Sequence, residues 1–463
     1  MAFVFRIECL VFLVASPLII GHQSLSFSSN KQKIIHVSPS GFDIPGCGYV
    51  LSPCRTLFHV FTTYRDLNDT TLQIRGTLQL NKSYSFENLY NFRISGSRDA
   101  KLEMSQIQCT ANTGLLIKNS RHIDLMGFKM KNCGSEWLDF NKSATHIAAL
   151  YFSNCSTVQL FSLHMIQSVG RAVVMEDGAG EVIFRDCVFA NIMNYYAGFG
   201  NLISSQLTGG GVYLRLTKSS SRHKRLSLDR RSYNNNFKFI NCCFKNNKFQ
   251  KLLKSNITHF EPANRGGGLA VLFEGKASSN TIEIITSQFS KNKAHYGGGL
   301  YVHFGCSTTN NNVLIRKCRF EKNQAETEGG AVFMKFENVL NYRKTLFPHQ
   351  FIFQNCRFEN NTSVSGGALS VYGTNNFECL ALPSTKHYFL IKFKKCYWLR
   401  NVATFGSAIS AFCSSQSELG PHVLCGLMLQ DCNISNNVVT TAKNQLLVGG
   451  GAVFTSMVPI ILR

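Results

Sequence analysis

Short runs in which hydrophobic and polar residues alternate recur along the chain. Clear examples are residues 123–130, 368–372 and 389–393. Alternation with a period of two is typical of β-strands that bury one face, whereas helices repeat hydrophobic positions every three to four residues. The pattern therefore predicts many short strands joined by tight polar turns.

A repeated motif organises the second half of the chain, clearly from about residue 184. Each copy has a short apolar strand, an aromatic or apolar anchor, an Asn three residues later, and then a Gly-rich segment such as Gly-Gly-Ala. Residues are added mainly between the Gly-rich strand and the next apolar strand, so the core of each copy stays constant. The anchors are Phe244, Phe289, Phe320, Phe358, Trp398 and Ile434.

Such repeats can bury one face only by stacking on their neighbours. We therefore expect an all-β fold, a right-handed single-stranded parallel β-helix with three strands per coil and a rise of about 4.8 Å per coil. At that spacing the amide side chains of successive coils can hydrogen-bond to each other. The predicted asparagine ladder consists of Asn247, Asn292, Asn323, Asn361, Asn401 and Asn437.

Two other repeated residue types have structural explanations. The Gly pair permits a left-handed backbone at a tight corner and close approach of neighbouring coils. The Cys near each anchor is expected to point inward as a free buried thiol, with a disulfide ladder as the alternative. This internal stack comprises Cys187, Cys242 or Cys243, Cys318, Cys356, Cys396 and Cys432.

The repeat, over about residues 184–454, resembles the polymorphic outer-membrane-protein repeat of surface adhesins and animal right-handed β-helix proteins. The segment His36–Leu57 is similar to the start of pectin-lyase-like domains, which implies a first strand followed by a capping helix. Thr56 can cap such a helix, and Leu57, Phe58, Phe61 and Tyr64 form its expected apolar face. Cys47 and Cys54 lie in a short polar loop, outside the stack, and are expected to form a disulfide.

The chain is expected to divide into a signal peptide (1–21), a capping strand and helix with the Cys loop (33–66), and the β-helix (67–463). The apolar run at the start is too short to span a bilayer, and an uncleaved anchor is the alternative. Removing it leaves 17 − 1 = 16 of the 17 Cys, in keeping with an oxidising compartment. The last repeat has no cap, so we expect a chain truncated at its C-terminus, and an ectodomain fragment of a larger membrane protein is one alternative.

Asn-x-Ser/Thr acceptors support export to a limited extent, because an Asn-rich chain contains several such sites by chance. The predicted glycosylation sites are Asn68, Asn81, Asn141, Asn154, Asn256, Asn360, Asn361 and Asn433. Other loop cysteines, Cys306, Cys379, Cys413 and Cys425, leave several pairings open.

The formal net charge is +22, although only 16% of the residues are charged. Positive charge is most concentrated in residues 218–231. We interpret this segment first as a solvated loop. The alternatives, in order, are a binding patch for acidic glycans or anionic surfaces and a convertase cleavage site after Arg225. Nucleic-acid binding conflicts with the signal peptide. The basic residues of this loop are Lys218, Arg222, Lys224, Arg225, Arg230 and Arg231.

Catalytic and metal-binding patterns are weak. The motifs of polygalacturonase-type enzymes are missing, Asp186 and Asp431 occupy a turn position, and no zinc-ligand spacing occurs. We therefore expect no cofactor and a secreted or cell-surface, non-catalytic protein with a structural, adhesive or recognition function. Its expected partners are extracellular glycans or proteins, acidic ones among them. No membrane span is expected within the chain. A polysaccharide lyase or glycoside hydrolase is the alternative.

Overall fold

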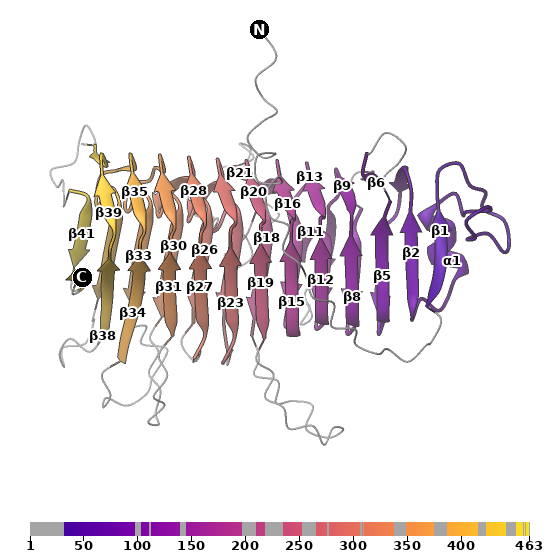
Figure 1. Cartoon of the computed structure of the whole chain (residues 1–463), viewed down its shortest axis with the longest axis horizontal. Coiled ribbons are helices and arrows are strands. Elements are labelled where there is room, and N and C mark those ends of the chain that lie inside the picture. The colour runs from indigo at the N-terminus through magenta and orange to yellow at the C-terminus, as the bar shows by residue number, and fades with distance from the viewer. Residues whose placement is uncertain are drawn as a thin grey trace, which may run out of the picture.

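A computed structural model describes residues 32–97, 103–110, 113–138, 145–196, 210–217, 235–251, 265–275, 277–305, 308, 310–337, 349–374, 387–414, 423–440, 451–456, 458 and 460–462. Three long parallel sheets wind around one axis and form an elongated rod (Figure 1). Each coil contributes one strand to each sheet, and the crossovers are right-handed, as expected for parallel strands. The chain is therefore a right-handed parallel β-helix with three strands per coil, as the sequence predicts.

The first strand of each coil belongs to the 13-stranded sheet, whose successive members pair in parallel. Its strands are β1 (Lys33–Val37), β2 (Thr70–Ile74), β5 (Tyr90–Gly96), β8 (Arg121–Met126), β12 (Ser156–Phe161), β15 (Ala179–Arg185), β19 (Asn236–Ile240), β23 (Thr281–Ile285), β27 (Asn312–Arg316), β31 (Gln350–Gln354), β34 (His387–Lys394), β38 (Val423–Gln430) and β42 (Ile460–Leu462).

The second strand of each coil follows after a tight corner and belongs to the 11-stranded sheet. Its strands are β3 (Thr77–Leu80), β6 (Ser105–Cys109), β9 (Phe128–Lys131), β13 (His164–Ile166), β16 (Val188–Ala190), β20 (Cys243–Lys245), β24 (Gln288–Ser290), β28 (Arg319–Glu321), β32 (Arg357–Glu359), β35 (Tyr397–Leu399) and β39 (Asn433–Ser435).

The third strand belongs to the 12-stranded sheet, in which β10 (Ser135–Leu138) is an antiparallel partner of β11. The parallel strands are β4 (Tyr84–Glu87), β7 (Leu115–Lys118), β11 (Thr145–Ser153), β14 (Arg171–Glu176), β18 (Val212–Leu216), β22 (Leu269–Phe273), β26 (Leu300–Phe304), β30 (Val332–Glu337), β33 (Leu369–Thr374), β37 (Ile409–Ser414) and β41 (Val453–Ser456).

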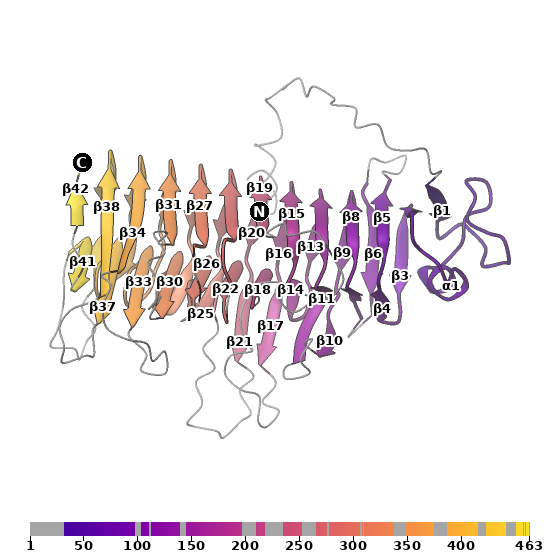
Figure 2. The same cartoon turned by 90° about the horizontal axis from the view of Figure 1, so that it is seen from below.

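Short strands lie between the 11-stranded and 12-stranded sheets in some coils. They form a four-stranded sheet of β17 (Met193–Tyr196), β21 (Lys248–Lys251), β25 (Lys293–Tyr296) and β29 (Gln324–Glu328), and a pair of β36 (Val402–Ala403) and β40 (Val438–Val439). In the view of Figure 2, β17 and β21 lie below the row of 12-stranded-sheet strands.

The interior is one continuous apolar core in which identical positions of successive coils stack. The repeat anchors Phe244 and Phe289 stack with ring centroids 4.5 Å apart, and Phe289 and Phe320 with 4.7 Å. The stack continues through Phe358 to Trp398, whose ring centroid is 5.4 Å from that of Phe358. These geometries are typical of offset aromatic pairs, so the regular coils pack through their anchors.

The asparagines form a hydrogen-bonded column along one corner. Asn323 Nδ2 donates to Asn361 Oδ1 at 3.0 Å, and Asn361 Nδ2 donates to Asn401 Oδ1 at 2.9 Å. From Asn292 onward each Oδ1 also accepts the backbone N–H of the preceding ladder residue, as Asn361 does from Asn323 at 3.0 Å. The column runs from Asn247 to Asn437, and its interior members are buried. Each buried amide group thus hydrogen-bonds to the neighbouring coil and stabilises the contact between successive coils.

In the regular coils the corner before the 12-stranded-sheet strand requires glycine. Gly329 has φ of 65°, in the left-handed region that glycine favours. A Cβ on Gly330 would lie 2.1 Å from the Gly367 carbonyl oxygen, so no side chain fits there. The corner before each 11-stranded-sheet strand is also left-handed, and Asp186 (φ 55°) and Asp431 (φ 52°) occupy it as turn residues.

The predicted thiol stack follows that same corner, with Cys242 as its member. Cys187, Cys242, Cys318, Cys356, Cys396 and Cys432 carry free thiols, and all except the half-buried Cys432 are buried. Each thiol donates to a carbonyl at the end of the previous coil's strand, as Cys242 does to Phe184 at 3.4 Å. Ser287 donates in the same way to the Phe239 carbonyl at 3.4 Å, so a hydroxyl also fits this column.

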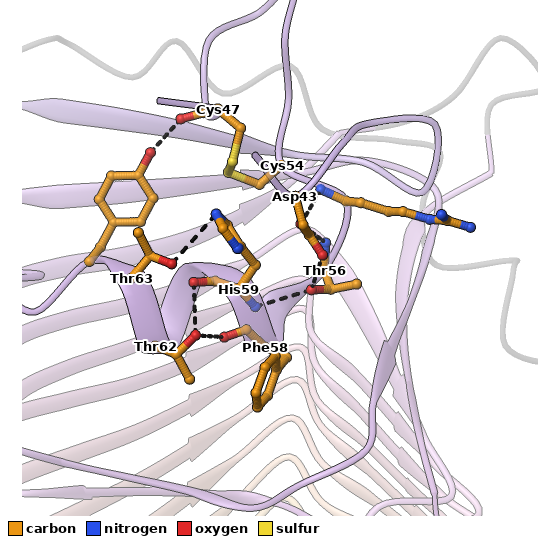
Figure 3. Close-up of a disulfide and its surroundings, with 10 residues drawn as sticks. Asp43, Cys47, Cys54, Thr56, Phe58, His59, Thr62 and Thr63 are labelled. Atoms are coloured by element: carbon orange, nitrogen blue, oxygen red, sulfur yellow. Dashed lines mark hydrogen bonds between the residues drawn. A yellow bond between two sulfur atoms is a disulfide. The ribbon is translucent and has the colours of Figure 1, made fainter. Parts of the chain in front are cut away.

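The capping helix α1 (Leu57–Thr63) begins at Thr56, whose hydroxyl accepts the His59 N–H at 3.0 Å. Leu57 and Val60 are buried, and Phe61 and Tyr64 pack against the core. The prediction for Phe58 is wrong: it is exposed, on the side of the helix away from the disulfide (Figure 3). Val60 is buried against the core instead.

Candidate functional site

Two rows of side chains run along the outer face of the 12-stranded sheet. The inter-coil register aligns the first row as Tyr151, Val174, Tyr213, Ala270, Tyr301, Phe333, Ser370 and Ser410. Two residues further along each strand, the second row contains Ser153, Glu176, Arg215, Leu272, His303, Lys335, Tyr372 and Phe412. Alternate residues point to opposite faces of a strand, so both rows point away from the core. We call these the outer-face rows.

Over the middle coils these rows are buried. Tyr151, Tyr213, Tyr301 and Phe333 belong to a second apolar cluster separate from the core, with Tyr296 and Tyr372 packed against its edge. A sheet face in contact with water normally carries polar side chains. The outer face of this sheet is therefore a specialised region of the rod.

One charged network in this region is built from groups of the rod itself. The Tyr151 hydroxyl donates to Glu176, and Arg215 lies 2.9 Å from Glu274 and 3.6 Å from Glu176. The Arg171 guanidinium lies 4.7 Å from the centroid of the Tyr213 ring, and burial raises the pKa of the Tyr213 hydroxyl to about 12. Since these charges are paired with each other, this network holds the face together.

The neighbouring strands carry polar atoms without such partners. The Tyr301 hydroxyl and His303 Nδ1 are buried and have no hydrogen-bond partner among the described residues. His303 Nε2 lies 3.3 Å from Glu337, which also contacts Lys335 Nζ at 2.6 Å. An unpaired buried polar atom costs about 1–3 kcal/mol, so each one requires an explanation, and a ligand is one.

Beyond β30 the second outer-face row becomes partly open, while Ser370 and Ser410 of the first row stay buried. The rings of Tyr372 and Phe412, both half-buried, stack with centroids 5.5 Å apart. Beside them Ser370 donates to Glu328 at 2.8 Å. A flat aromatic surface next to carboxylate and hydroxyl groups can pack against the apolar face of a sugar ring and bind its hydroxyls.

Two carboxylates on this face have opposite pKa shifts. The contact with His303 outweighs burial and, together with Lys335, lowers the pKa of Glu337 to about 2. Burial raises the pKa of Glu328, against the opposing effects of Ser370 and His295. One carboxylate is thus held ionised, while the other is more easily protonated.

The described residues hold one group with the composition of a metal site, formed by Cys47, Cys54 and His59. The two sulfur atoms are joined to each other at 2.05 Å. A disulfide offers no thiolate for a metal ion, so these residues do not fit a metal centre.

The structure separates the predicted glycosylation acceptors by environment. Asn68, Asn81, Asn154 and Asn433 are exposed, and Asn360 is half-buried at a left-handed turn. The prediction for Asn361 is wrong for the folded chain, because its side chain is buried and bonded within the ladder. Asn141 and Asn256 lie outside the described residues.

Other predicted features also lie outside the described residues. These are the signal peptide and the entire basic loop, namely Lys218, Arg222, Lys224, Arg225, Arg230 and Arg231. Their roles remain predictions. The disulfide expected between Cys47 and Cys54 is present in the capping loop.

Sequence reasoning missed a second disulfide and the outer-face rows. Cys109 and Cys133 are bonded, with Cα atoms 4.9 Å apart, and they join neighbouring coils in the less regular half. Cys155 is a further buried free thiol, and burial raises its pKa to about 12. A signal for the rows was present in the single aromatic residue that several strands carry after the Gly-rich corner, such as Tyr213, Tyr301 and Phe333, but its alignment depends on the register between coils.

No family model and no curated protein matches the chain. Among solved structures, it is similar to the catalytic domain of a GH87 alpha-1,3-glucanase in complex with nigerose (11% identity, TM-score 0.44), covering 93% of this chain and 70% of that one. It is also similar to the A-module of the Azotobacter vinelandii mannuronan C-5 epimerase AlgE6 (9% identity, TM-score 0.35, covering 84% and 90%).

A third similar structure is PfbA, a surface adhesin of Streptococcus pneumoniae (10% identity, TM-score 0.30), covering 84% of this chain and 86% of that one. Proteins with this architecture thus include carbohydrate-active enzymes and an adhesin, and likenesses this distant carry no argument about function. In the part of the chain that the structure describes, no helix has the length and apolar character of a membrane span.

Proposed function

We propose that the protein is a secreted or cell-surface β-helix that binds extracellular glycans or proteins through its outer-face rows, without catalysis. The observation that carries this proposal is that the half-buried Tyr372–Phe412 stack shares the outer face with the buried Tyr301 hydroxyl and His303 Nδ1, which have no hydrogen-bond partner among the described residues. Aromatic contact area and a few convergent polar groups are the usual contents of a binding site. The rod supplies rigidity, so little ordering entropy is lost on binding.

Two disulfides between described residues support an oxidising compartment for this function. The buried thiols are consistent with it, because burial holds the pKa of Cys356 well above its usual range and thiolate is the reactive form. Secretion of the mature chain can be tested by expressing the full sequence and finding the protein in the medium without residues 1–21.

The ligand face is tested with the full chain and a panel of neutral and uronic-acid polysaccharides, using retardation of the protein in polysaccharide-containing gels. Tyr372→Ala should weaken retention by about tenfold, because it removes one ring of the stack. Tyr397→Ala is the matched control, since Tyr397 is also an accessible aromatic but lies on β35 in the 11-stranded sheet. Equal retention of the two variants would contradict the proposed face.

The alternative of a polysaccharide-active enzyme has one specific observation in its favour. Glu328, at the end of β29, contacts Ser370 of the first outer-face row, and Glu337 ends β30. Their pKa values shift in opposite directions, as those of acid and base groups do. Prolonged incubation with the retained polysaccharide decides between the two functions. New reducing ends or unsaturated products that disappear in Glu337→Gln would establish catalysis.

A further inference from the structure

The loop between β1 and α1 projects from the N-terminal end of the rod in both views (Figures 1 and 2). Its backbone is pinned to β1, because the His36 N–H donates to Gly48 at 2.8 Å and the Cys54 N–H donates to His36 at 2.9 Å. The Cys47–Cys54 disulfide closes the loop at its base.

Side chains below the disulfide hold the same loop (Figure 3). The Asp43 carboxylate accepts the backbone N–H groups of Arg55 and Thr56 at 2.8 and 3.0 Å, and the Thr56 hydroxyl at 2.7 Å. The Tyr64 hydroxyl donates to the Cys47 carbonyl. The loop is thus fixed in one conformation before it meets any partner.

The tip of this rigid loop is apolar and exposed. Tyr49, Val50 and Leu51 are 73%, 70% and 97% exposed, and Phe42 and Ile44 are exposed beside them. The Ser52 N–H donates to the Tyr49 carbonyl at 3.1 Å, which places Val50 and Leu51 at the corners of a tight turn. Such corners usually carry Gly, Asn, Asp or Ser, so a Val-Leu pair needs a cause other than the turn.

No charged residue lies between Ile44 and Pro53, whereas the chain as a whole carries +22. A convex tip without charges, whose hydrogen-bonding side chains are those of Tyr49 and Ser52, offers few directional contacts to a protein partner. It does fit the acyl-chain region of a lipid surface, with Tyr49 at the headgroup level, where tyrosine is enriched. The basic chain would add attraction to anionic headgroups.

We propose that residues 42–53 form a membrane-interface anchor, which inserts Val50 and Leu51 into a lipid surface and docks this end of the rod there. The anchor lies away from the outer-face rows, so it adds a lipid contact to the proposed recognition function without depending on it. It orients the rod with its N-terminal end on the membrane.

The test is co-sedimentation of the full chain with phosphatidylcholine vesicles, with and without phosphatidylserine. The parent should bind, and more strongly with phosphatidylserine. The double variant Val50→Ser/Leu51→Ser should bind at least about tenfold more weakly to both, because two apolar side chains no longer leave water. Tyr397→Ser, an exposed aromatic on the strand β35 far from the loop, should bind like the parent.

A second measurement places the tip in the bilayer. Leu51→Trp should show a blue-shifted tryptophan emission when vesicles are added, whereas the parent's two tryptophans should not respond. Equal binding of the double variant and the parent, or no vesicle binding by the parent, would overturn the proposal. So would a parent dimer in solution that the double variant abolishes, because the tip would then contact a second copy. Polysaccharide retention should be unchanged in the double variant, which separates this result from a failure of the proposed function.

Discussion

The corner that follows the 11-stranded sheet is stabilised in two ways in the two halves of the rod. In the later coils it carries the asparagine ladder, while the equivalent positions in the earlier coils are Cys133, Ser168 and Ile192. Cys133 is bonded to Cys109 of the preceding coil, and the Ser168 hydroxyl has no partner among the described residues. The ladder couples each coil to both neighbours through a repeated side chain, whereas the disulfide joins two coils once.

This difference implies that the two halves depend on different interactions for stability. A stacked array owes its stability to each unit and to the interface with the next one. Removing one ladder member should affect two interfaces, while breaking the disulfide should release a constraint on the unfolded chain. Substitutions that remove one of these interactions at a time can separate their contributions to stability.

The largest effect is expected for Asn361→Ala, which should lower the free energy of unfolding by about 4 kcal/mol. The substitution leaves the Asn323 N–H and the Phe320 carbonyl unpaired in the interior. Asn360→Gly is the matched control, because glycine accepts the left-handed φ of 54° at that turn. Urea titration compares the two variants, and similar unfolding midpoints would show that the ladder contributes little.

Cys109→Ser/Cys133→Ser should cost about 3 kcal/mol, the loop-closure entropy expected for this sequence separation of 24. Hydrogen exchange should then accelerate in β6 and β9 but not in β28 and β32. Uniform acceleration along the whole rod would mean that the two halves unfold as one unit. Their stabilities would then not depend on different interactions.

Acidification should lower the free energy of unfolding by on the order of 3 kcal/mol through His349, which lies in the later coils. Burial lowers the pKa of His349 from 6.5 to about 4, despite its bonds to Asn311 and Thr308. Because the unfolded chain binds a proton at higher pH than the folded chain does, this contribution destabilises the protein progressively from about pH 6.5 down to pH 4. His349→Gln should flatten that part of the stability profile, and an unchanged profile would exclude His349 as the cause.

The smallest effect, under about 1 kcal/mol, is expected for Cys356→Ser. Its thiol donates to the Ile315 carbonyl at 3.4 Å, and Ser287 already makes the corresponding contact in its own coil. Cys356→Val cannot donate and should destabilise the protein more than Cys356→Ser does. The reverse order in thermal denaturation would show that the column needs apolar volume, and not a donor.

The later coils were predictable because Asn and the aromatic anchor occur at a fixed offset that survives insertions. The earlier coils were not, since the same corner there holds Cys133, Ser168 or Ile192, which share no motif. The outer-face rows escaped prediction for a related reason. Tyr301 and Phe333 become neighbours only through the pairing of β26 with β30, which depends on the register between coils.

The thiol stack could be predicted in outline, but the sequence did not show whether Cys242 or Cys243 belongs to it. The left-handed turn at Asn241 decides between them, because it directs the first cysteine inward and starts a strand at the second. The prediction for Phe58 was wrong for a similar reason. Which residues of the helix face the core depends on how the helix packs on the end of the core, and the sequence pattern does not give that orientation.

Hydrogen–deuterium exchange with a retained polysaccharide tests recognition by the outer-face rows most directly. The account predicts slower exchange in β26, β30 and β33 when the polysaccharide is present, with unchanged exchange in β31 and β34 of the 13-stranded sheet. Protection confined to β31 and β34, or to the 11-stranded sheet, would contradict the proposed recognition face.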